Sequence, residues 1–429
     1  MASRKLVAVA CVAAAVLAFV KTASGEEAGP CSVKITRANV ARCAVVVSPS
    51  IRAQQHGADA LRGRERTATT WLPSNPNLIL TGARRTASGG LPEAINWHAG
   101  LSQEIEIGGQ RGPRRDAATA QVMAQEQRVV LSRREVAAEA WTAFFEVIAA
   151  DEGQRLALRL AAAADGIAVL ARARAEQGLS SKVEADIAEA STVRFVHGRF
   201  EQERRLTEAH ARLATLLGLD SSVTPTVEGD LAPLAGVEES ARQAVGRMNQ
   251  RPEVRAAEAE RQAFDSRAAL YRRSRIPNPS ISVFVQNDGF DERVLGVGLS
   301  LPIPVPAPIG RTYAGEIDEA SALSRRASTD IDRLRREIGL ELVTSIRNFE
   351  SRRREVDAIT PDQVGRAERG VEALAQEITA GRLNVRDALL GQQALVELLQ
   401  ARLAARQALS LASVDLARAA GLPLDGDGT

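Results

Sequence analysis

Two short segments of the chain alternate apolar and polar residues, and each begins at an Asn-Pro pair, Asn75-Pro76 and Asn278-Pro279. Successive side chains of a strand point to opposite faces, so this period of two predicts strands with one apolar face. A second alternating run follows each first one. We therefore expect one strand pair at about residues 76–107 and another at about 279–303.

The second predicted pair has an apolar face opposed by glycine and serine. That apolar face comprises Ile281, Val283, Val285, Leu295, Val297, Leu299 and Leu301. A strand of a soluble sandwich would alternate in the same way. Strands of about ten residues, however, match the length of a tilted transmembrane β-strand.

Long segments with apolar residues three or four apart follow each strand pair. From about Arg114 to Gln177 the chain contains few glycines and no proline, which predicts a helical rod of roughly 90 Å. Partner segments of the same kind run from Ser181 to Leu217 and from Asn384 to Ala420. An ordinary coiled-coil scaffold would show the same periodicity.

The chain repeats one design at a spacing of 203 residues. Pro252 answers Pro49, Gly381 answers Gly178, and Gly421 answers Gly218. Such self-similarity indicates an internal duplication. We expect a first repeat at residues 25–220, with a helical hairpin at about 114–218, and a second at 221–429, with a hairpin at about 312–421.

Residues 1–24 have the pattern of a signal peptide. Arg4 and Lys5 precede an apolar run that is shorter than the roughly twenty residues of a membrane-spanning helix, and small residues follow it. Removing this segment leaves 52 basic and 53 acidic residues from the 55 and 53 of the whole chain, so a basic nucleic-acid-binding protein is not indicated. Cys31 and Cys43 remain and could form a disulfide in an oxidising compartment.

Four strands alone cannot close a membrane barrel, because the smallest barrels have about eight and an open edge is not tolerated in lipid. The sequence therefore predicts a mixed α/β membrane protein that oligomerises to complete its sheet, with long helices continuing from the strands as a hollow cylinder.

The strand-to-helix passages "LSQEIEIGGQRGPRR" at 101–115 and "VGLSLPIPVPAPIGRTYAGEI" at 297–317 resemble those of the TolC-type outer-membrane factors of tripartite efflux systems. The likeness covers nearly the whole chain after the signal peptide, and "EIEIGGQRGPR" is most similar to the CzcC-like heavy-metal branch. The resemblance implies a homotrimer in the outer membrane that extends into the periplasm. Its barrel would have four strands per protomer and twelve per trimer, continued by a periplasmic α-helical barrel.

The resemblance also implies partners and cargo. A passive duct of this family works with a periplasmic adaptor, also called a membrane fusion protein, and with an inner-membrane pump of the resistance-nodulation-division class. The branch exports divalent metal cations of the cobalt, zinc, cadmium and nickel type. We expect contact with outer-membrane lipid, no nucleic acid, no cofactor, no resident metal and no enzymatic activity.

The same resemblance assigns roles to the two glycine turns between paired helices. The expected adaptor contacts are Gly178, Leu179, Ser180, Gly381, Arg382 and Leu383. The expected acids of the periplasmic gate are Glu184, Asp387 and Asp186. Ser181-x-x-Glu184 and Asn384-x-x-Asp387 are also capping-box patterns, so these acids could instead hold helix starts. Leu390 stands where some relatives place another acid.

Other candidate chemistry is sparse. His56, His98, His197 and His210 lack metal-ligand spacing and are expected on polar surfaces. Arg111, Arg114, Arg115 and Arg311 follow the strands and are expected to meet lipid headgroups or to solvate helix starts. The alternative functions are a periplasmic adaptor or a coiled-coil scaffold of an export system. An adaptor would carry one helical hairpin rather than two.

Overall fold

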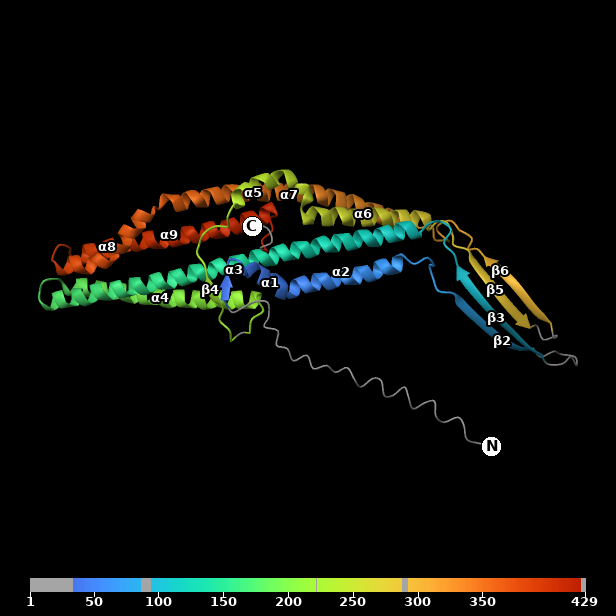
Figure 1. The fold of residues 1–429 in the computed structure, drawn as a ribbon, viewed down its shortest axis with the longest axis horizontal. Coiled ribbons are helices and arrows are strands. Elements are labelled where there is room, and N and C mark those ends of the chain that lie inside the picture. Colours follow the sequence, from blue (N-terminus) through green and yellow to red (C-terminus); the bar gives the residue numbers. More distant parts are fainter. Residues whose placement is uncertain (1–33, 86–93, 221, 288–291, 426–429) are drawn as a thin grey trace, which may run out of the picture.

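The structure, a computed structural model, describes residues 34–85, 94–220, 222–287 and 292–425. The predicted signal peptide and Cys31 lie outside these ranges, so the signal peptide and the Cys31–Cys43 pairing stay predictions. The described residues form a long molecule with a sheet at one end and helices along the rest (Figure 1). In chain order the elements are β1 (Lys34–Thr36), α1 (Val40–Val47), α2 (Pro49–Ala68), β2 (Asn77–Arg85), β3 (Ala94–Glu104), α3 (Arg111–Glu176), α4 (Lys182–Leu216), β4 (Thr226–Glu228), α5 (Val237–Ala244), the 3-10 helix η1 (Val245–Gln250), α6 (Pro252–Arg273), β5 (Ser280–Asn287), β6 (Arg293–Ser300), α7 (Ala314–Ala358), α8 (Pro361–Thr379) and α9 (Val385–Ala420).

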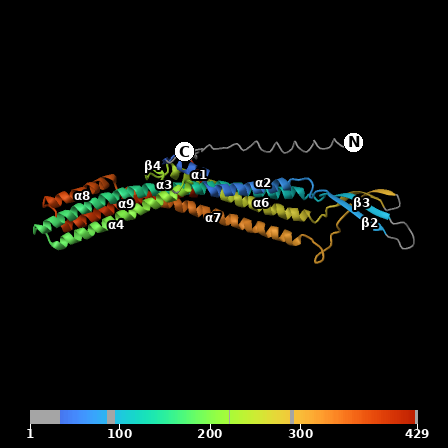
Figure 2. The same ribbon diagram turned by 90° about the horizontal axis from the view of Figure 1, so that it is seen from below.

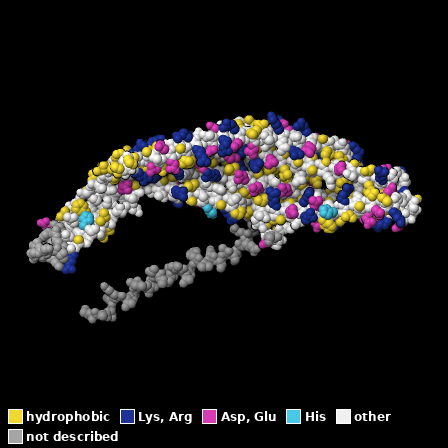
Figure 3. Space-filling model, turned by 180° about the vertical axis from the view of Figure 1, so that it is seen from behind, with side chains coloured by type: hydrophobic (Ala, Val, Ile, Leu, Met, Phe, Trp, Pro, Cys, Tyr) yellow, Lys and Arg dark blue, Asp and Glu magenta, His cyan; other side chains and the backbone are white. Residues whose placement is uncertain are grey.

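The strands that follow the Asn-Pro pairs lie in one antiparallel sheet, in the order β2-β3-β5-β6. The register joins apolar positions into rows across the sheet, such as Leu78 opposite Leu101, Leu101 opposite Val283, and Val283 opposite Val297. All four side chains in this row are exposed. Figure 3 shows hydrophobic side chains gathered toward this end, while charged side chains are scattered along the helices.

The other face of the sheet carries mainly polar and small residues, with Ile79 and Val294 among them, around one aromatic pair. The rings of His98 and Phe284 stack with centroids 5.3 Å apart. Phe284 also lies over Gly296, where a Cβ atom would come within 2.3 Å of the ring. Glycine at this position is therefore required by the close approach of Phe284.

The helices run side by side away from the sheet (Figures 1 and 2). α3 has 66 residues and is therefore about 100 Å long. Proline occupies the first turn of both α2 and α6, as the repeated Pro49 and Pro252 predict, because its fixed φ and missing N–H suit that place. β2 and β5 likewise begin at positions 203 residues apart, although the proposed division at residue 220 stays a prediction.

The main hydrophobic core lies near the middle of the rod. Trp141, Phe144 and Phe145 of α3 form its aromatic centre, and the Trp141 indole N–H donates to the carbonyl of Leu424 at 3.0 Å. Beside this core, β1 pairs in parallel with β4, and Ile35 of β1 is fully buried. The sequence reasoning missed this pair because three-residue strands have no detectable periodicity.

The first arm of the hairpin expected at about residues 312–421 is not one continuous helix. α7 ends at Ala358, and α8 begins anew at Pro361. Thr360 and Gln363 form a capping box, in which the Thr360 N–H donates to Gln363 Oε1 at 2.8 Å. Proline preceded by this cap starts a new helix, whereas α3 continues unbroken through the corresponding region.

Candidate functional site

The turn between α3 and α4 lies at the end of the molecule far from the sheet (Figure 1). Gly178 follows the helix with φ +72°, in the left-handed region. The N–H of Gly178 donates to Ala175 O at 3.1 Å, and the N–H of Leu179 donates to Arg174 O at 2.8 Å. These two bonds are those of a Schellman motif, which requires the glycine.

The turn between α8 and α9 has the same construction. Gly381 has φ +70°, its N–H donates to Ile378 O at 3.1 Å, and the N–H of Arg382 donates to Glu377 O at 3.0 Å. Both predicted glycine turns are thus present, at equivalent points of two helical hairpins.

The structure joins the two turns into one unit, which we call the tip. Arg174 Nη1 of α3 donates to the Ile378 carbonyl of α8 at 3.1 Å. The buried residues shared by both hairpins are Ile167, Ala168, Ala171, Ala188, Leu374, Ile378, Val385 and Ala388. The sequence reasoning missed Arg174, whose only signal is that it is a basic residue in the last turn of a helix.

The predicted adaptor contacts are not equally exposed. Leu179 is 62% exposed, and the Ser180 hydroxyl donates to Ala171 O at 3.5 Å. Leu383 is half-buried and packs against the tip cluster. Leu383 therefore contributes to the packing of the tip, whereas Leu179 does not.

Arg382 forms the strongest polar contact within the second turn. Its Nε and Nη2 donate to the two carboxylate oxygens of Glu377, both at 2.7 Å. These hydrogen bonds lower the pKa of Glu377 from its ordinary value, against a smaller opposing effect of burial. Glu377 therefore stays ionised, and the pair presents little net charge.

The predicted gate acids lie just inside α4 and α9. Glu184 is half-buried, while Asp186 and Asp387 are exposed. The first turn lacks the hydroxyl bond of a capping box, because the Ser181 side chain accepts from the N–H of Val183, while the N–H of Glu184 donates to the Ser181 carbonyl at 3.1 Å. Asn384 Oδ1 accepts from the Asp387 N–H at 2.7 Å, and Asn384 Nδ2 donates to the Asp387 carboxylate at 2.7 Å. The Asn384 side chain thus caps α9, and its amide group also donates to the Asp387 carboxylate.

A groove of about 980 Å³ runs above the tip between α3, α4 and α9. Phe195, His197 and Gly198 line it from α4, and Val396 and Leu403 from α9. α4 and the turn before it also expose an apolar series comprising Leu179, Val183, Ile187, Val193 and Phe200. At 3.6 residues per turn the four members within α4 lie on one broad face of the helix, and the sequence reasoning did not single this face out.

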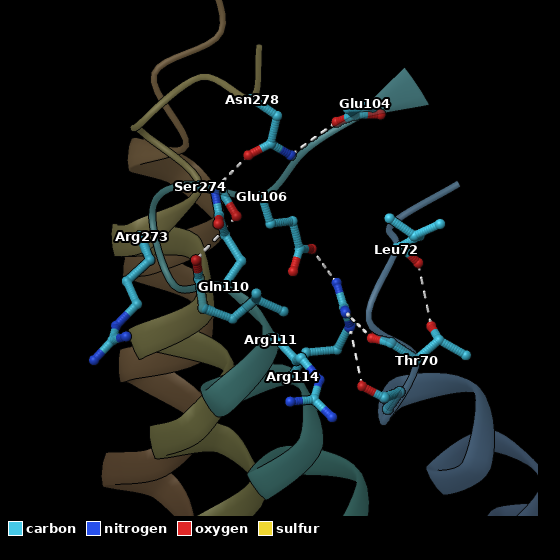
Figure 4. A network of polar contacts seen from close by, with 12 residues as sticks. Thr70, Leu72, Glu104, Glu106, Gln110, Arg111, Arg114, Arg273, Ser274 and Asn278 are labelled. Carbon is cyan, nitrogen blue, oxygen red and sulfur yellow. Dashed lines mark hydrogen bonds and ion pairs between the residues drawn. The ribbon is translucent and has the colours of Figure 1, made fainter. Parts of the chain in front are cut away.

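The junction between sheet and helices is held by the polar network drawn in Figure 4. Asn278, of the repeated Asn-Pro pair, accepts from Gln110 Nε2 at 2.9 Å and donates to Glu104 Oε1 at 2.8 Å. It therefore links the start of β5 to both β3 and α3. Asn75, by contrast, is exposed.

Two of the arginines after the strands have a different role from the one expected. Arg111 donates twice to Thr69 O, at 3.1 and 2.9 Å, and Arg114 donates to Ala68 O and pairs with Glu106. Both arginines thus bind the carbonyls that end α2, as basic groups do at helix C-termini. This role was not expected from the sequence, and their contact with lipid headgroups stays a prediction. Arg115 and Arg311 pair with the nearby acids Asp116 and Glu316.

Metal and histidine chemistry is sparse among the described ranges. No group of three or more His, Cys, Asp or Glu residues there could hold a metal ion. His98 stacks in the sheet, and burial lowers the pKa of the half-buried His210. None of the helices described is both long enough and apolar enough to cross a membrane.

Comparison with known proteins adds a family and a fold. Residues 43–219 match the family described as outer membrane efflux protein. The chain is 29% identical over 289 residues to the nickel-cobalt-cadmium resistance protein NccC of Alcaligenes xylosoxydans xylosoxydans, covering 67% of this chain and 63% of NccC. It is 26% identical over 252 residues to the nickel and cobalt resistance protein CnrC of Cupriavidus metallidurans, covering 59% of each. The fold is similar to that of the CmeC outer membrane channel of Campylobacter jejuni, with a TM-score of 0.75, 14% identity, and coverage of 89% of this chain and 84% of CmeC.

Proposed function

Because residues 43–219 belong to the outer membrane efflux protein family, and the fold is that of an outer-membrane channel, we propose that this chain is the passive exit duct of a tripartite efflux pump. The match bears out the predicted family and the outer-membrane location. The duct has no catalytic step, and an inner-membrane pump of the resistance-nodulation-division class supplies the energy.

The observation that carries the proposal is the sheet. Its apolar face is exposed over all strands, and helices continue directly from it as rods of up to about 100 Å. An apolar sheet face of this extent is stable in lipid, while the charged helices are stable in water. One molecule thus combines a membrane end with a long aqueous end.

The sheet also supports assembly of three copies. In the part of the chain that is described, β2 pairs only with β3 and β6 only with β5, so each has one unpaired edge. Joining β6 of one copy to β2 of the next satisfies these edges. Three copies of four strands give the twelve-stranded barrel, and their helices continue it as a periplasmic tunnel.

The tip is the place where we propose that the adaptor binds. The exposed Leu179, the glycines of both turns and Arg382 face away from the packed cluster there. Glu184, Asp387 and Asp186 are the proposed acids of the tunnel entrance. A periplasmic adaptor or a scaffold is less well supported, since neither uses an exposed apolar sheet.

The cargo is inferred from names of similar proteins. NccC and CnrC are resistance proteins for nickel and cobalt, and NccC also for cadmium. We propose that this duct likewise exports divalent metal cations. It needs no resident metal site, because cations pass through the tunnel without being held.

Membrane fractionation of cells that produce the protein tests the proposal. The duct requires an outer-membrane trimer that dissociates on heating in detergent. A deletion strain should be more sensitive to nickel, cobalt or cadmium, and the parent gene should restore resistance. A soluble periplasmic monomer would rule out the duct, and unchanged sensitivity to all three metals would rule out the cargo.

A further inference from the structure

A pocket of about 320 Å³ lies beside the middle of the rod, between α3, η1 and the turn that ends α9. Three arginines line it, Arg134 from α3 and Arg247 and Arg251 from η1 and its end. Its remaining lining is Ser240, Gln243, Ala244, Gln250, Ala420, Gly421, Leu422 and Pro423. No acidic side chain is among the described residues that line it, although Glu253 pairs with Arg251 behind the lining.

Arg134 is the unusual member of this group. Its Nη1 atom is buried and has no hydrogen-bond partner within the described residues. Burial lowers the pKa of Arg134 from its ordinary value, against an opposing effect of the Glu253 carboxylate. A buried charged donor without an acceptor is costly, so such a group is expected to have a partner.

Gly421 leaves room for the Arg134 guanidinium. A Cβ atom on Gly421 would lie 3.3 Å from Arg134 Nη1 and 3.7 Å from Arg251 Nε. Two guanidinium groups therefore approach the same point from two sides. Like charges repel at this range, and the Glu253 carboxylate, which pairs with Arg251, is an anion that reduces this repulsion within the described residues.

The two nearby acids, Glu253 and Asp425, do not accept a hydrogen bond from Arg134 Nη1. Glu253 accepts from Arg251 at 2.6 and 3.2 Å, and Arg251 also donates to the Ala419 carbonyl. Asp425 influences Arg134 only through its charge. Arg251 is thus satisfied internally, whereas Arg134 Nη1 and the exposed Arg247 have donors to spare.

Capping of α9 does not explain the arrangement. A basic group is favourable at a helix C-terminus, and Arg251 fulfils that role through the Ala419 carbonyl. Arg134 Nη1 has no acceptor within the described residues, on α9 or elsewhere. The buried donor of Arg134 therefore needs another acceptor.

We propose that this pocket binds an oxyanion, a carboxylate or a phosphate, through Arg134 and Arg247, with Arg251 adding positive charge. Guanidinium groups match the oxygens of such anions in geometry and charge. The anion is either free phosphate or a carboxylate of the cell-wall peptides. The second source rests on the proposed function, since it requires a rod in the periplasm. Arg134 lies 23 residues into α3, about 35 Å below the sheet.

The test uses the purified full chain as isolated from membranes. Calorimetry measures binding of inorganic phosphate, and co-sedimentation measures binding to isolated cell-wall sacculi. Arg134→Gln and Arg247→Gln are the test variants. Arg133→Gln is the matched control, because Arg133 is adjacent on α3 but lines a different pocket with Arg42 and Arg52.

We expect both test variants to weaken anion binding by about tenfold or more, and Arg133→Gln to leave it unchanged. Phosphate binding without sacculus binding identifies free phosphate as the ligand. Sacculus binding that phosphate competes away identifies wall carboxylates. The proposal is overturned if the parent binds neither probe at millimolar concentrations, or if Arg247→Gln, whose exposed side chain is not needed for folding, binds as the parent does. Outer-membrane fractionation reports separately on the duct.

Discussion

Leu179 and Leu383 hold similar places after the two tip glycines but have different surroundings. Leu179 is 62% exposed, whereas Leu383 packs against the cluster around Ile378. We expect Leu179→Asp to change stability by less than about 0.5 kcal/mol and to abolish metal resistance, because it alters only the proposed adaptor surface. Leu383→Asp should instead cost about 1 to 3 kcal/mol, since it places a charge against packed apolar side chains.

Thermal unfolding of the purified protein measures the change in stability, and metal-sensitivity plates measure resistance. Leu179→Met is the conservative control and should retain both stability and resistance. Full resistance in Leu179→Asp, with normal protein in the membrane, would remove this residue from the adaptor surface.

Glu184 and Asp387 can be tested for charge separately from capping. Because Ser181 and Asn384 supply the caps, Glu184→Gln with Asp387→Asn should alter stability by no more than about 0.5 to 1 kcal/mol. If the two acids line the entrance in three copies, the double variant should lose cation selectivity, since carboxylates raise the local cation concentration. Reversal potentials and block by trivalent cations in planar bilayers measure this. Unaltered selectivity would place the constriction elsewhere.

At the scale of the elements, a side chain of α9 stabilises the break between α7 and α8. Arg402 of α9 donates to the carbonyls of Val356 and Ile359, the last acceptors before the break. We expect Arg402→Met to cost about 1.5 to 3 kcal/mol, because two acceptors lose a charged donor. Hydrogen exchange at residues 359–364 should become faster while α3 keeps its protection. Arg402→Lys should restore part of the effect, and equal exchange in all three proteins would show that the cap at Thr360 suffices alone.

How far the elements follow from sequence depends on the range of the signal. The Asn-Pro pairs, the prolines that open α2 and α6, and Gly178 and Gly381 act on their own neighbours, so their places were predictable. The pairing of β1 with β4, the bond from Arg174 to Ile378 and the packing of Leu383 depend on residues far along the chain. No local pattern reports such contacts. Pro361 is a local signal for a helix start. The break between α7 and α8 was nevertheless not predicted, because the helical spacing of apolar residues continues on both sides of it.

For the whole molecule, the proposed duplication gives the register of the seam between copies. Leu80 and Val283 are equivalent positions, because they end the matching segments "NPNLIL" and "NPSISV". Leu101 and Leu299 are equivalent too, because each begins the matching pair "LS". Since Leu101 faces Val283 within one chain, Leu299 should face Leu80 of the next copy. Cysteines at both positions should give covalent trimers with a short bifunctional maleimide reagent. Cysteines at Ile79 and Leu299 point to opposite faces and should not. Cross-linking of the second pair alone would shift the register by one residue.

The parallel pair of β1 and β4 and the bond from Trp141 to Leu424 also set an order of folding. The core around Phe144 closes only when residues 227 and 424 are available, so its contacts join the two ends of the chain. At about 5 to 20 residues per second of synthesis, the first half waits roughly 10 to 40 s for the second. During that interval β3 lacks its neighbour β5, and the core around Phe144 lacks the residues that α9 and the chain after it supply. The yield of folded protein thus depends on protection of the incomplete chain. Slower synthesis of the second half should increase aggregation and proteolysis of the protein more than slower synthesis of the first half.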